Sequence, residues 1–210
     1  MTKRITTVAA SLITVGLLAG CSTDEAGAPT PSQKTSASQS PSAAELPHSG
    51  APAVTSTVDT GKWEGKPCDA LTSSQLSSNR LNSVEAEPDL QSMNGPQCSW
   101  YSPNTGSFGG AFLTKTPTGE PPQGLSAGYA NNKKNPFAIW QEVTIEGQPA
   151  VIANEKDQRN RGECGVAVGL RDDLAYSVRI TDPDKDFAND PCAFAKKIAT
   201  LAVTTMKGGS

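Results

Sequence analysis

Carboxylates are the residues of this chain that come nearest to a catalytic arrangement. Glycosidases use two carboxyl groups, one as acid and one as base or nucleophile, on either side of the bond that they cleave. The glutamates near predicted strand ends are Glu142, Glu146, Glu155 and Glu163. Sequence spacing does not bring any two of them together, so a carboxylate-dependent cell-wall hydrolase is the least favoured of the functions that we consider.

An aspartate-rich stretch imitates the start of a calcium-binding loop. The densest acidic cluster consists of Asp182, Asp184, Asp186 and Asp190. Its first three members alternate as the first ligands of an EF-hand loop do. The sixth position, where that loop needs glycine, is Phe187, and the twelfth, where it needs glutamate, is Ala193. We therefore expect a solvated loop without a metal ion.

Nucleophilic catalysis that depends on histidine has no base in the region that we expect to fold. His48 is the only histidine, and it lies in a segment rich in Ser, Thr and Pro. Phe108-Gly109-Gly110 falls inside a predicted strand, where glycine marks a bulge or a close backbone approach and not a phosphate loop. We expect no cofactor and no enzymatic activity.

The N-terminus has the pattern of a secretory signal that ends in a cysteine. Lys3-Arg4 precedes an apolar stretch of about 15 residues, which is too short and too often interrupted by hydroxyl residues for a membrane span. Leu18-Ala19-Gly20-Cys21 resembles a lipobox, which implies cleavage after residues 1–20 and lipidation of the Cys21 thiol. Because two acyl chains anchor a protein stably, we expect it on the extracytoplasmic face of the cell membrane.

Composition divides the rest of the chain into a tether and one domain. Residues 21–60 are dominated by Ser, Thr, Ala and Pro, with too few large apolar side chains to offset the entropy of ordering, so we expect a lipidated and disordered tether. Residues 61–210 have the size of a single domain.

The net charge of the chain after signal cleavage is negative. Loss of Lys3-Arg4 leaves 16 of the 18 basic residues against 21 acidic ones. This negative balance disfavours nucleic acid as a partner, and it disfavours direct contact of the domain with anionic lipid.

Apolar periodicity predicts an α+β fold, an antiparallel sheet with helices packed on one face. Alternation is clearest in 164–170 and 174–180, where every second residue is apolar and one face must be buried. Asp190 followed by Pro191 predicts the start of a helix that runs to about Met206. The other expected elements are helices at 72–82 and 125–134 and strands at 97–101, 108–115, 143–145 and 150–152.

Four cysteines remain for the domain once Cys21 is assigned to lipid. They are Cys68, Cys98, Cys164 and Cys192. An even number in an exported domain predicts two disulfides, with three connectivities possible. We favour Cys68 with Cys98 and Cys164 with Cys192, because each bond would tie a terminal helix to a neighbouring strand in loops of similar size. The spacing lacks the close pairs that zinc sites use, so we expect no metal.

The tryptophans divide into one core residue and two candidates for ligand stacking. Trp100 is two residues from Cys98 on a predicted strand, so the two share a face and Trp100 is expected in the core. Trp63 precedes the fold and Trp140 begins a strand. Either could stack on a ligand, although residues in such places more often cover an edge of the core.

Several of these landmarks together carry a family resemblance. They are Pro67-Cys68, Cys98-Ser99-Trp100, Gly147-Gln148-Pro149-Ala150, Cys164 and Asp190-Pro191-Cys192-Ala193-Phe194-Ala195. Their order over about residues 63–206, with the lipobox and the tether, is similar to the family of actinobacterial lipoproteins called domain of unknown function 3558. The resemblance implies a lipid-anchored extracytoplasmic domain with paired cysteines. It supplies no activity and no catalytic residues.

We therefore expect a non-enzymatic binding or interaction module that Cys21 anchors to the membrane, with an unknown protein or a cell-wall component as its partner. The main alternative is a carrier that encloses a lipid or another apolar molecule between the sheet and the helices. Aromatic residues make up only 5% of the chain, which counts against a spacious apolar cavity.

Overall fold

The computed structural model describes residues 45–102, 106–116 and 118–208. The predicted signal segment, Cys21 and the greater part of the predicted tether lie outside these residues. Among the helices that are described, none combines the length and the apolar character that a membrane crossing requires.

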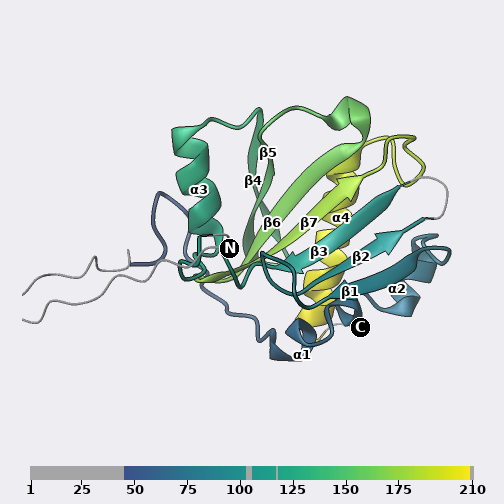
Figure 1. Ribbon diagram of the computed structural model, residues 1–210, viewed down its shortest axis with the longest axis horizontal. Helices are drawn as coiled ribbons and strands as arrows, with labels where there is room; N and C mark the ends of the chain where they lie inside the picture. The colour runs from purple at the N-terminus through teal and green to yellow at the C-terminus, as the bar shows by residue number, and fades with distance from the viewer. Residues whose placement is uncertain (1–44, 103–105, 117, 209–210) are drawn as a thin grey trace, which may run out of the picture. The chain divides into compact units, whose positions relative to one another are not determined.

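The strands form one seven-stranded sheet in the order β1-β2-β3-β7-β6-β5-β4 (Figure 1). They are β1 (Glu85–Asp89), β2 (Gln97–Tyr101), β3 (Ser107–Phe112), β4 (Ile139–Ile145), β5 (Gln148–Asn154), β6 (Glu163–Arg171) and β7 (Leu174–Thr181). Every neighbouring pair is antiparallel. The chain adds β4 to β7 from the far edge inward, so its last strand pairs with β3 and lies in the middle of the sheet.

Helix α4 (Pro191–Met206) covers one face of this sheet and lies behind it in Figure 1. The Asp190 carboxylate accepts hydrogen bonds from the N–H groups of Cys192 and Ala193 at 2.9 and 3.0 Å, and Pro191 follows it, so the predicted helix start is confirmed. The buried side of the helix consists of Pro191, Phe194, Ala195, Ile198, Ala199, Ala202, Val203 and Met206. Each large aliphatic side chain buried here contributes about 1.5–3 kcal/mol.

Shorter helices extend the layer formed by α4. They are α1 (Gly61–Glu64), the 3-10 helices η1 (Pro67–Ala70) and η2 (Arg159–Arg161), and α2 (Ser73–Ser78). Thr72 and Gln75 form the predicted capping box of α2, but this helix ends at Ser78, before the predicted residue 82. The Gln75 side chain also donates to the Leu201 carbonyl at 3.0 Å, which fastens α2 to α4.

Helix α3 (Leu125–Lys134) lies on the opposite face, so the α+β class is confirmed but the helical cover is not limited to one face. Leu125 and Tyr129 form a second buried cluster with Val151 and Ala175. Gly169 leaves room for this contact, because a Cβ at that position would meet Leu125 Cδ1 at 3.1 Å. In the part of the chain that the structure describes, no helix covers this face over β1, β2 and β3 (Figure 1).

The boundary between tether and domain lies upstream of the predicted residue 61. Val54 and Val58 are 9% and 4% exposed, and Thr60 is fully buried. The Val54 N–H donates to Asp172 Oδ1 at 2.8 Å, and the Val58 N–H donates to the Leu170 carbonyl at 2.9 Å. The prediction of a tether through residue 60 is therefore wrong for 45–60, because its few aliphatic residues dock on the β6–β7 hairpin.

Two disulfides join the layers with the predicted connectivity. Cys68 of η1 is bonded to Cys98 of β2, and Cys164 of β6 is bonded to Cys192 of α4. Each closes a loop of about 30 residues, which on the chain-entropy model stabilises by roughly 3.5–4 kcal/mol. Trp100 is 1% exposed and stacks on Phe108 with ring centroids 5.3 Å apart, so its predicted core position is confirmed.

Candidate functional site

The uncovered face of β1, β2, β3 and β7 carries an ordered array of polar side chains. Strand register arranges them in rows that run across the sheet. The central row is Glu87, Ser99, Gly109, Arg179 and Gly165. The flanking rows are Asp89, Gln97, Ala111, Ser177 and Ala167, and Glu85, Tyr101, Ser107, Thr181 and Glu163. Every member of a row points to the same side, because side chains alternate along each strand.

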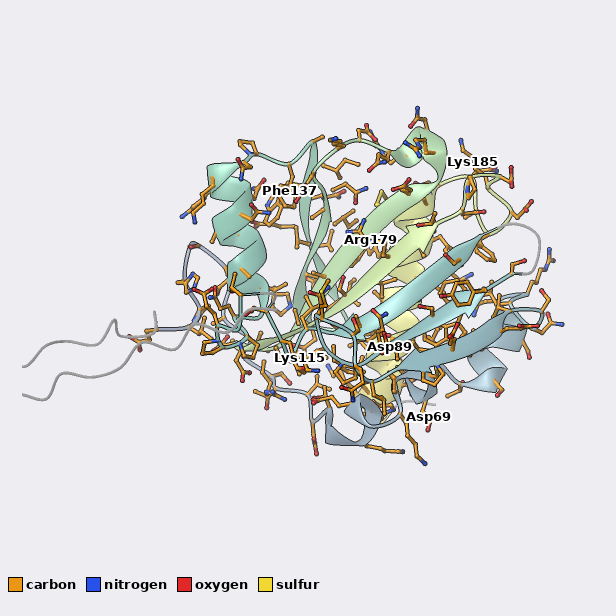
Figure 2. The ribbon with its side chains drawn as sticks, viewed as in Figure 1. Asp69, Asp89, Lys115, Phe137, Arg179 and Lys185 are labelled. Carbon is orange, nitrogen blue, oxygen red and sulfur yellow. A yellow bond between two sulfur atoms is a disulfide. The ribbon has the colours of Figure 1, made fainter. Side chains whose placement is uncertain are left out.

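Arg179 is the cation at the centre of this array. It lies over the middle of the sheet in Figure 2, on the face turned toward the viewer. Its partners on the two adjacent strands are Gly109 and Gly165, which have no side chains, and Arg179 is exposed. Among the described residues no carboxylate approaches it within 4 Å.

A shallow polar groove lies beside Arg179 and has a volume of about 300 Å³. We call it the Arg179 groove. Its walls are formed by Asn94, Gln97, Ser99, Tyr101, Ser107, Phe108, Gly109, Gly110, Ala111, Leu113, Ser177, Arg179 and Thr181. Tyr101 is 44% exposed and is the one large aromatic ring on this face of β2. On the other side of Arg179, a second hollow of about 520 Å³ extends toward Lys156 and Gln158.

The two consecutive glycines of β3 differ in what the fold requires of them. A Cβ on Gly110 would approach the Tyr176 hydroxyl to 1.8 Å, so packing excludes a side chain there. A Cβ on Gly109 would meet nothing nearer than the Cys98 carbonyl at 3.4 Å, an ordinary contact. The predicted close approach therefore occurs at Gly110. At Gly109 the missing side chain only leaves the floor of the Arg179 groove open.

Carboxylates line the β1 edge of the same face. Glu85, Glu87 and Asp89 lie opposite Tyr101, Ser99 and Gln97 of β2, and all three are exposed. Strand spacing of about 4.8 Å puts the β1 and β7 backbones about 14 Å apart. The face thus changes from hydrogen-bond acceptors at β1, through hydroxyl and amide groups, to a cation at β7.

The four glutamates considered as candidates for an acid and base pair are spread along β4, β5 and β6. Glu146 lies in the turn before β5 and Glu155 follows the end of that strand. The seven residues of β5 span about 23 Å, more than the roughly 10 Å that separates glycosidase carboxylates at most. Glu142 lies in β4, and Glu163 is 3.9 Å from the Arg161 guanidinium.

Glu142 of β4 instead contributes to a raised pKa of Tyr129, which lies in α3. Burial raises the pKa of Tyr129 to about 12, and a hydrogen bond to the Glu142 carboxylate and its negative charge add to this shift. Trp140 packs edge-on against Tyr129 with ring centroids 4.9 Å apart, and against Phe137 at 5.7 Å. These contacts belong to the packing of α3.

Asp182 organises a loop and is not arranged as a calcium ligand. Its side chain is 1% exposed and accepts hydrogen bonds from the backbone N–H groups of Asp186, Phe187 and Ala188 at 3.0, 2.9 and 3.3 Å. Asp184 and Asp186 are exposed. No group of three metal-binding side chains converges among the residues that the structure describes.

The two tryptophans considered as candidates for ligand stacking belong to different clusters. Trp63 of α1 packs against the main core, where the Lys62 ammonium lies 5.2 Å from its ring centre. Trp140 packs beneath α3 in the second cluster. Neither lines the Arg179 groove.

His48 lies against the folded domain and not in a free tether, which corrects its predicted position. Its backbone N–H donates to Ser126 Oγ of α3 at 3.0 Å. The His48 ring contacts the hydroxyl of the adjacent Ser49 at 3.1 Å.

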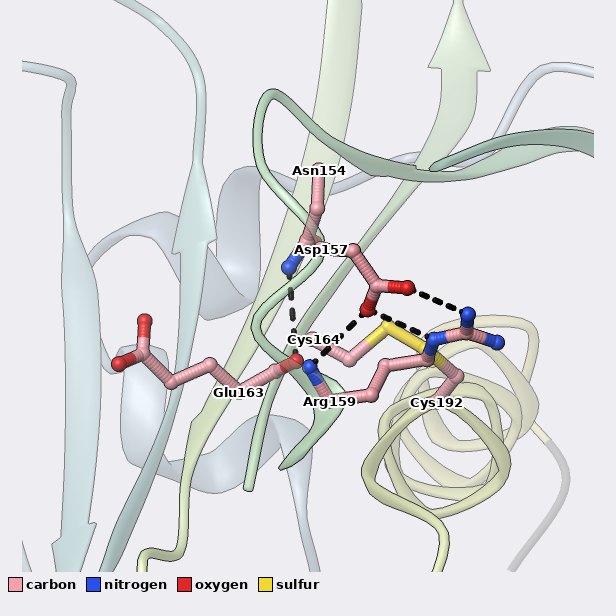
Figure 3. A network of polar contacts seen from close by, with 6 residues as sticks. All are labelled: Asn154, Asp157, Arg159, Glu163, Cys164 and Cys192. Carbon is pink, nitrogen blue, oxygen red and sulfur yellow. Dashed lines mark hydrogen bonds and ion pairs between the residues drawn. A yellow bond between two sulfur atoms is a disulfide. The ribbon is translucent and has the colours of Figure 1, made fainter. Parts of the chain in front are cut away.

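Beside the Cys164–Cys192 disulfide, the opposite charges of Asp157 and Arg159 pair with each other (Figure 3). Arg159 donates to both carboxylate oxygens of Asp157, at 2.9 and 2.6 Å. Hydrogen bonds from the side chain and backbone of Arg159 lower the pKa of Asp157 to about 2. The adjacent hollow at the start of α4 also contains Asp190, whose carboxylate already caps the helix. Asp157 and Arg159 therefore neutralise each other, whereas Lys185, which also lines this hollow, has no ion pair among the described residues.

The residues of the Arg179 groove are absent from the site predicted from sequence. A signal was available, because the inward alternation of Leu174, Tyr176, Val178 and Ile180 in β7 requires Arg179 to point outward. The sequence does not reveal which residues accompany it. Gly109 and Ser99 become its neighbours only through the pairing of β7 with β3 and of β3 with β2.

Comparison with known proteins gives a family and no function. No curated protein and no solved structure matches the chain. The family described as "Protein of unknown function (DUF3558)" matches residues 16–205, which is most of the chain and all of the sheet. The protein therefore belongs to the DUF3558 family.

Proposed function

We propose that this protein is a non-enzymatic binding module, anchored by lipid at Cys21 to the extracytoplasmic face of the cell membrane, and that it binds its partner in the Arg179 groove. The observation that carries the proposal is Arg179 itself, a cation on a polar face with no ion pair among the described residues, flanked by two glycines. In ligand sites, a small number of placed polar or charged groups in a hollow fix the orientation of the ligand.

The anchoring part of the proposal is supported by the lipobox-like Leu18-Ala19-Gly20-Cys21 and by the disulfides. Two disulfides are typical of proteins that fold outside the reducing cytoplasm. Metabolic labelling with a fatty-acid analogue tests it. The label should be lost from a Cys21→Ser variant and kept by a Cys68→Ser variant, and equal labelling of both would contradict anchoring at Cys21.

The carrier alternative gains no support from the packing between the sheet and α4. The space between the sheet and α4 is filled by side chains that are fully buried, among them Val168, Val178 and Ile198. The hollows named above lie on the surface and have mostly polar linings.

Site-specific photocrosslinking in cells tests the binding face. A photoreactive amino acid at Ser177, in the Arg179 groove, should yield a reproducible crosslinked species with the full chain. The matched control places the same group at Lys197, an exposed residue of α4 on the opposite side of the sheet. Crosslinks of equal yield from both positions, or none from Ser177, would reject this face as the binding site.

A further inference from the structure

We infer that the Arg179 groove takes a short, hydroxyl-rich oligosaccharide that carries a single carboxylate, with this carboxylate on Arg179 and the sugar hydroxyls extending over Ser99 toward Glu87. The inference rests on the proposed function and adds the chemical class and the orientation of the ligand. It follows from the side chains, the spacing and the charges of the central row and its neighbours.

The cationic end of the groove determines the anionic group of the ligand. A guanidinium presents planar, paired N–H donors that match the two oxygens of a carboxylate. Arg179 has no such partner among the described residues, and its cross-strand neighbours Gly109 and Gly165 have no side chains. A single arginine can bind a single carboxylate in this paired manner.

The acidic strand β1, which lies next to the Arg179 groove, disfavours a ligand with many negative charges. Glu85, Glu87 and Asp89 face the same side as Arg179 and would repel a polyanion that crosses the sheet. Ionised carboxylates only accept hydrogen bonds, and hydroxyl groups can donate to them. The β1 edge is therefore suited to the hydroxyls of a neutral sugar unit, about 14 Å from the β7 strand.

The middle of the groove also favours a sugar over a protein partner. Its side chains are small and carry hydroxyl or amide groups, as in Ser99, Ser177 and Gln97. None of these three side chains forms a hydrogen bond to another described residue. Protein interfaces are depleted in serine and acidic residues and depend on large apolar anchors. The exposed ring of Tyr101 gives a sugar ring one apolar surface on which to stack.

Packing does not explain why residue 109 is a glycine, whereas a ligand in the Arg179 groove does. A strand interior is weakened by glycine, by roughly 0.5–1 kcal/mol relative to alanine. The backbone around Gly109 would accept a Cβ without a close contact, unlike Gly110. Glycine in a strand also marks a place where a ligand approaches the backbone. In the Arg179 groove it leaves space for the ligand between Ser99 and Arg179.

A matched pair of disaccharides tests the carboxylate. Cellobiuronic acid differs from cellobiose by one carboxylate in place of a hydroxymethyl group. Titration of the full lipidated protein in nanodiscs should show at least tenfold tighter binding of cellobiuronic acid, and this preference should weaken at high salt. Equal affinity for both sugars would overturn the inference, as would tighter binding of poly-glutamate than of the disaccharide.

Two variants test whether the preference for cellobiuronic acid arises in the Arg179 groove. Arg179→Gln should lose at least tenfold in affinity for cellobiuronic acid and remain unchanged for cellobiose. Arg80→Gln removes an equally charged, exposed side chain that follows α2, outside the groove, and should change neither. An Arg179→Gln protein that still prefers the acid would overturn the assignment of Arg179.

Gly109→Val separates loss of the ligand from loss of the fold. A β-branched residue suits a strand and its Cβ fits at this position, so the variant should fold, and urea unfolding measured beside the titration checks this. The variant should also lose binding of both sugars at least tenfold, because it fills the floor of the groove. Unchanged binding would overturn the inference.

The crosslinking experiment at Ser177 distinguishes the two proposals. A specific crosslink at Ser177 without any binding of the sugars rejects the oligosaccharide and retains the binding face. If neither the Ser177 crosslink nor binding of the sugars is observed, the binding face is rejected as well.

Discussion

The hydroxyl of Tyr176 occupies the space that a side chain on Gly110 would need. A Cβ on Gly110 would lie 1.8 Å from this oxygen and 2.5 Å from the ring carbon that bears it. Tyr176 is fully buried, and its hydroxyl has no hydrogen-bond partner among the described residues. Burial raises the pKa of this phenol. The contact joins β3 to β7 beneath the Arg179 groove.

Gly110→Ala should lower the free energy of unfolding by about 1–3 kcal/mol, because the added methyl group overpacks the core against a rigid ring. Gly109→Ala is the matched control on the next residue, where the added Cβ fits. It should be neutral or stabilising by up to about 1 kcal/mol. Urea unfolding of both variants measures the difference, and equal losses would contradict the distinction between these glycines.

Tyr176→Phe should leave the protein as stable as before or more stable. The substitution removes a buried oxygen without a partner, and burial of such a group costs about 1–3 kcal/mol. The same urea measurement tests it. A loss above about 1 kcal/mol would mean that the hydroxyl is bonded in solution, for example to a buried water molecule.

The titration of Tyr129 should be displaced to high pH. Its pKa is raised from 10.0 to about 12, by burial first and then by Glu142. Because the folded pKa is the higher one, the stability linked to the neutral phenol is fully present below pH 10. It is lost as the pH rises from 10 through about 12.

Absorbance of tyrosinate near 295 nm measures this pKa in a protein with Tyr101→Phe and Tyr176→Phe, which leaves Tyr129 as the only one of three tyrosines. Glu142→Gln should move the titration downward but not to 10, because burial remains. A midpoint at the ordinary value in the parent background would show that Tyr129 is not buried against Glu142.

Asp182→Asn should destabilise the protein by about 1–3 kcal/mol. The carboxylate accepts three backbone hydrogen bonds, two of them on Oδ2, and an amide nitrogen in that place cannot accept any. Asp184→Asn, at an exposed neighbour, is the control and should have little effect. Thermal unfolding provides the comparison, and added calcium should shift neither variant nor the parent. A calcium-dependent rise in melting temperature that Asp182→Asn abolishes would restore the calcium hypothesis.

Removal of residues before Gly61 should destabilise the domain, whereas removal of residues before Glu45 should not. The shorter chain loses Val54 and Val58, two buried aliphatic residues that are each worth about 1.5–3 kcal/mol when fully buried. It also loses their backbone bonds to the β6–β7 hairpin. Urea unfolding of the two truncated chains tests this, and identical midpoints would restore the predicted boundary at residue 61.

The elements predicted correctly are those with a strong local signal. The β6–β7 hairpin follows from period-two alternation, and the start of α4 follows from Asp190 and Pro191. The disulfide pairing was favoured among three connectivities because it joined each terminal helix to a strand, and the structure has that pairing.

The strand β1 shows why other elements escaped prediction. All five of its residues are exposed, and Pro88 interrupts the sequence, so it has no buried alternation to recognise. It is a strand because its backbone pairs with β2. The same holds for residues 45–60, whose isolated valines become core residues only when they contact β6.

The fold class, the outward direction of Arg179 and the presence of enough cysteines for two disulfides follow from the sequence, because alternation and capping act between residues that are close along the chain. The position of Arg179 between Gly109 and Gly165, with Ser99 and Glu87 in the same row, follows from the assembled sheet. Those neighbours are set by the order of strands in the sheet. Strand order depends on the packing of the whole domain, and no local pattern encodes it.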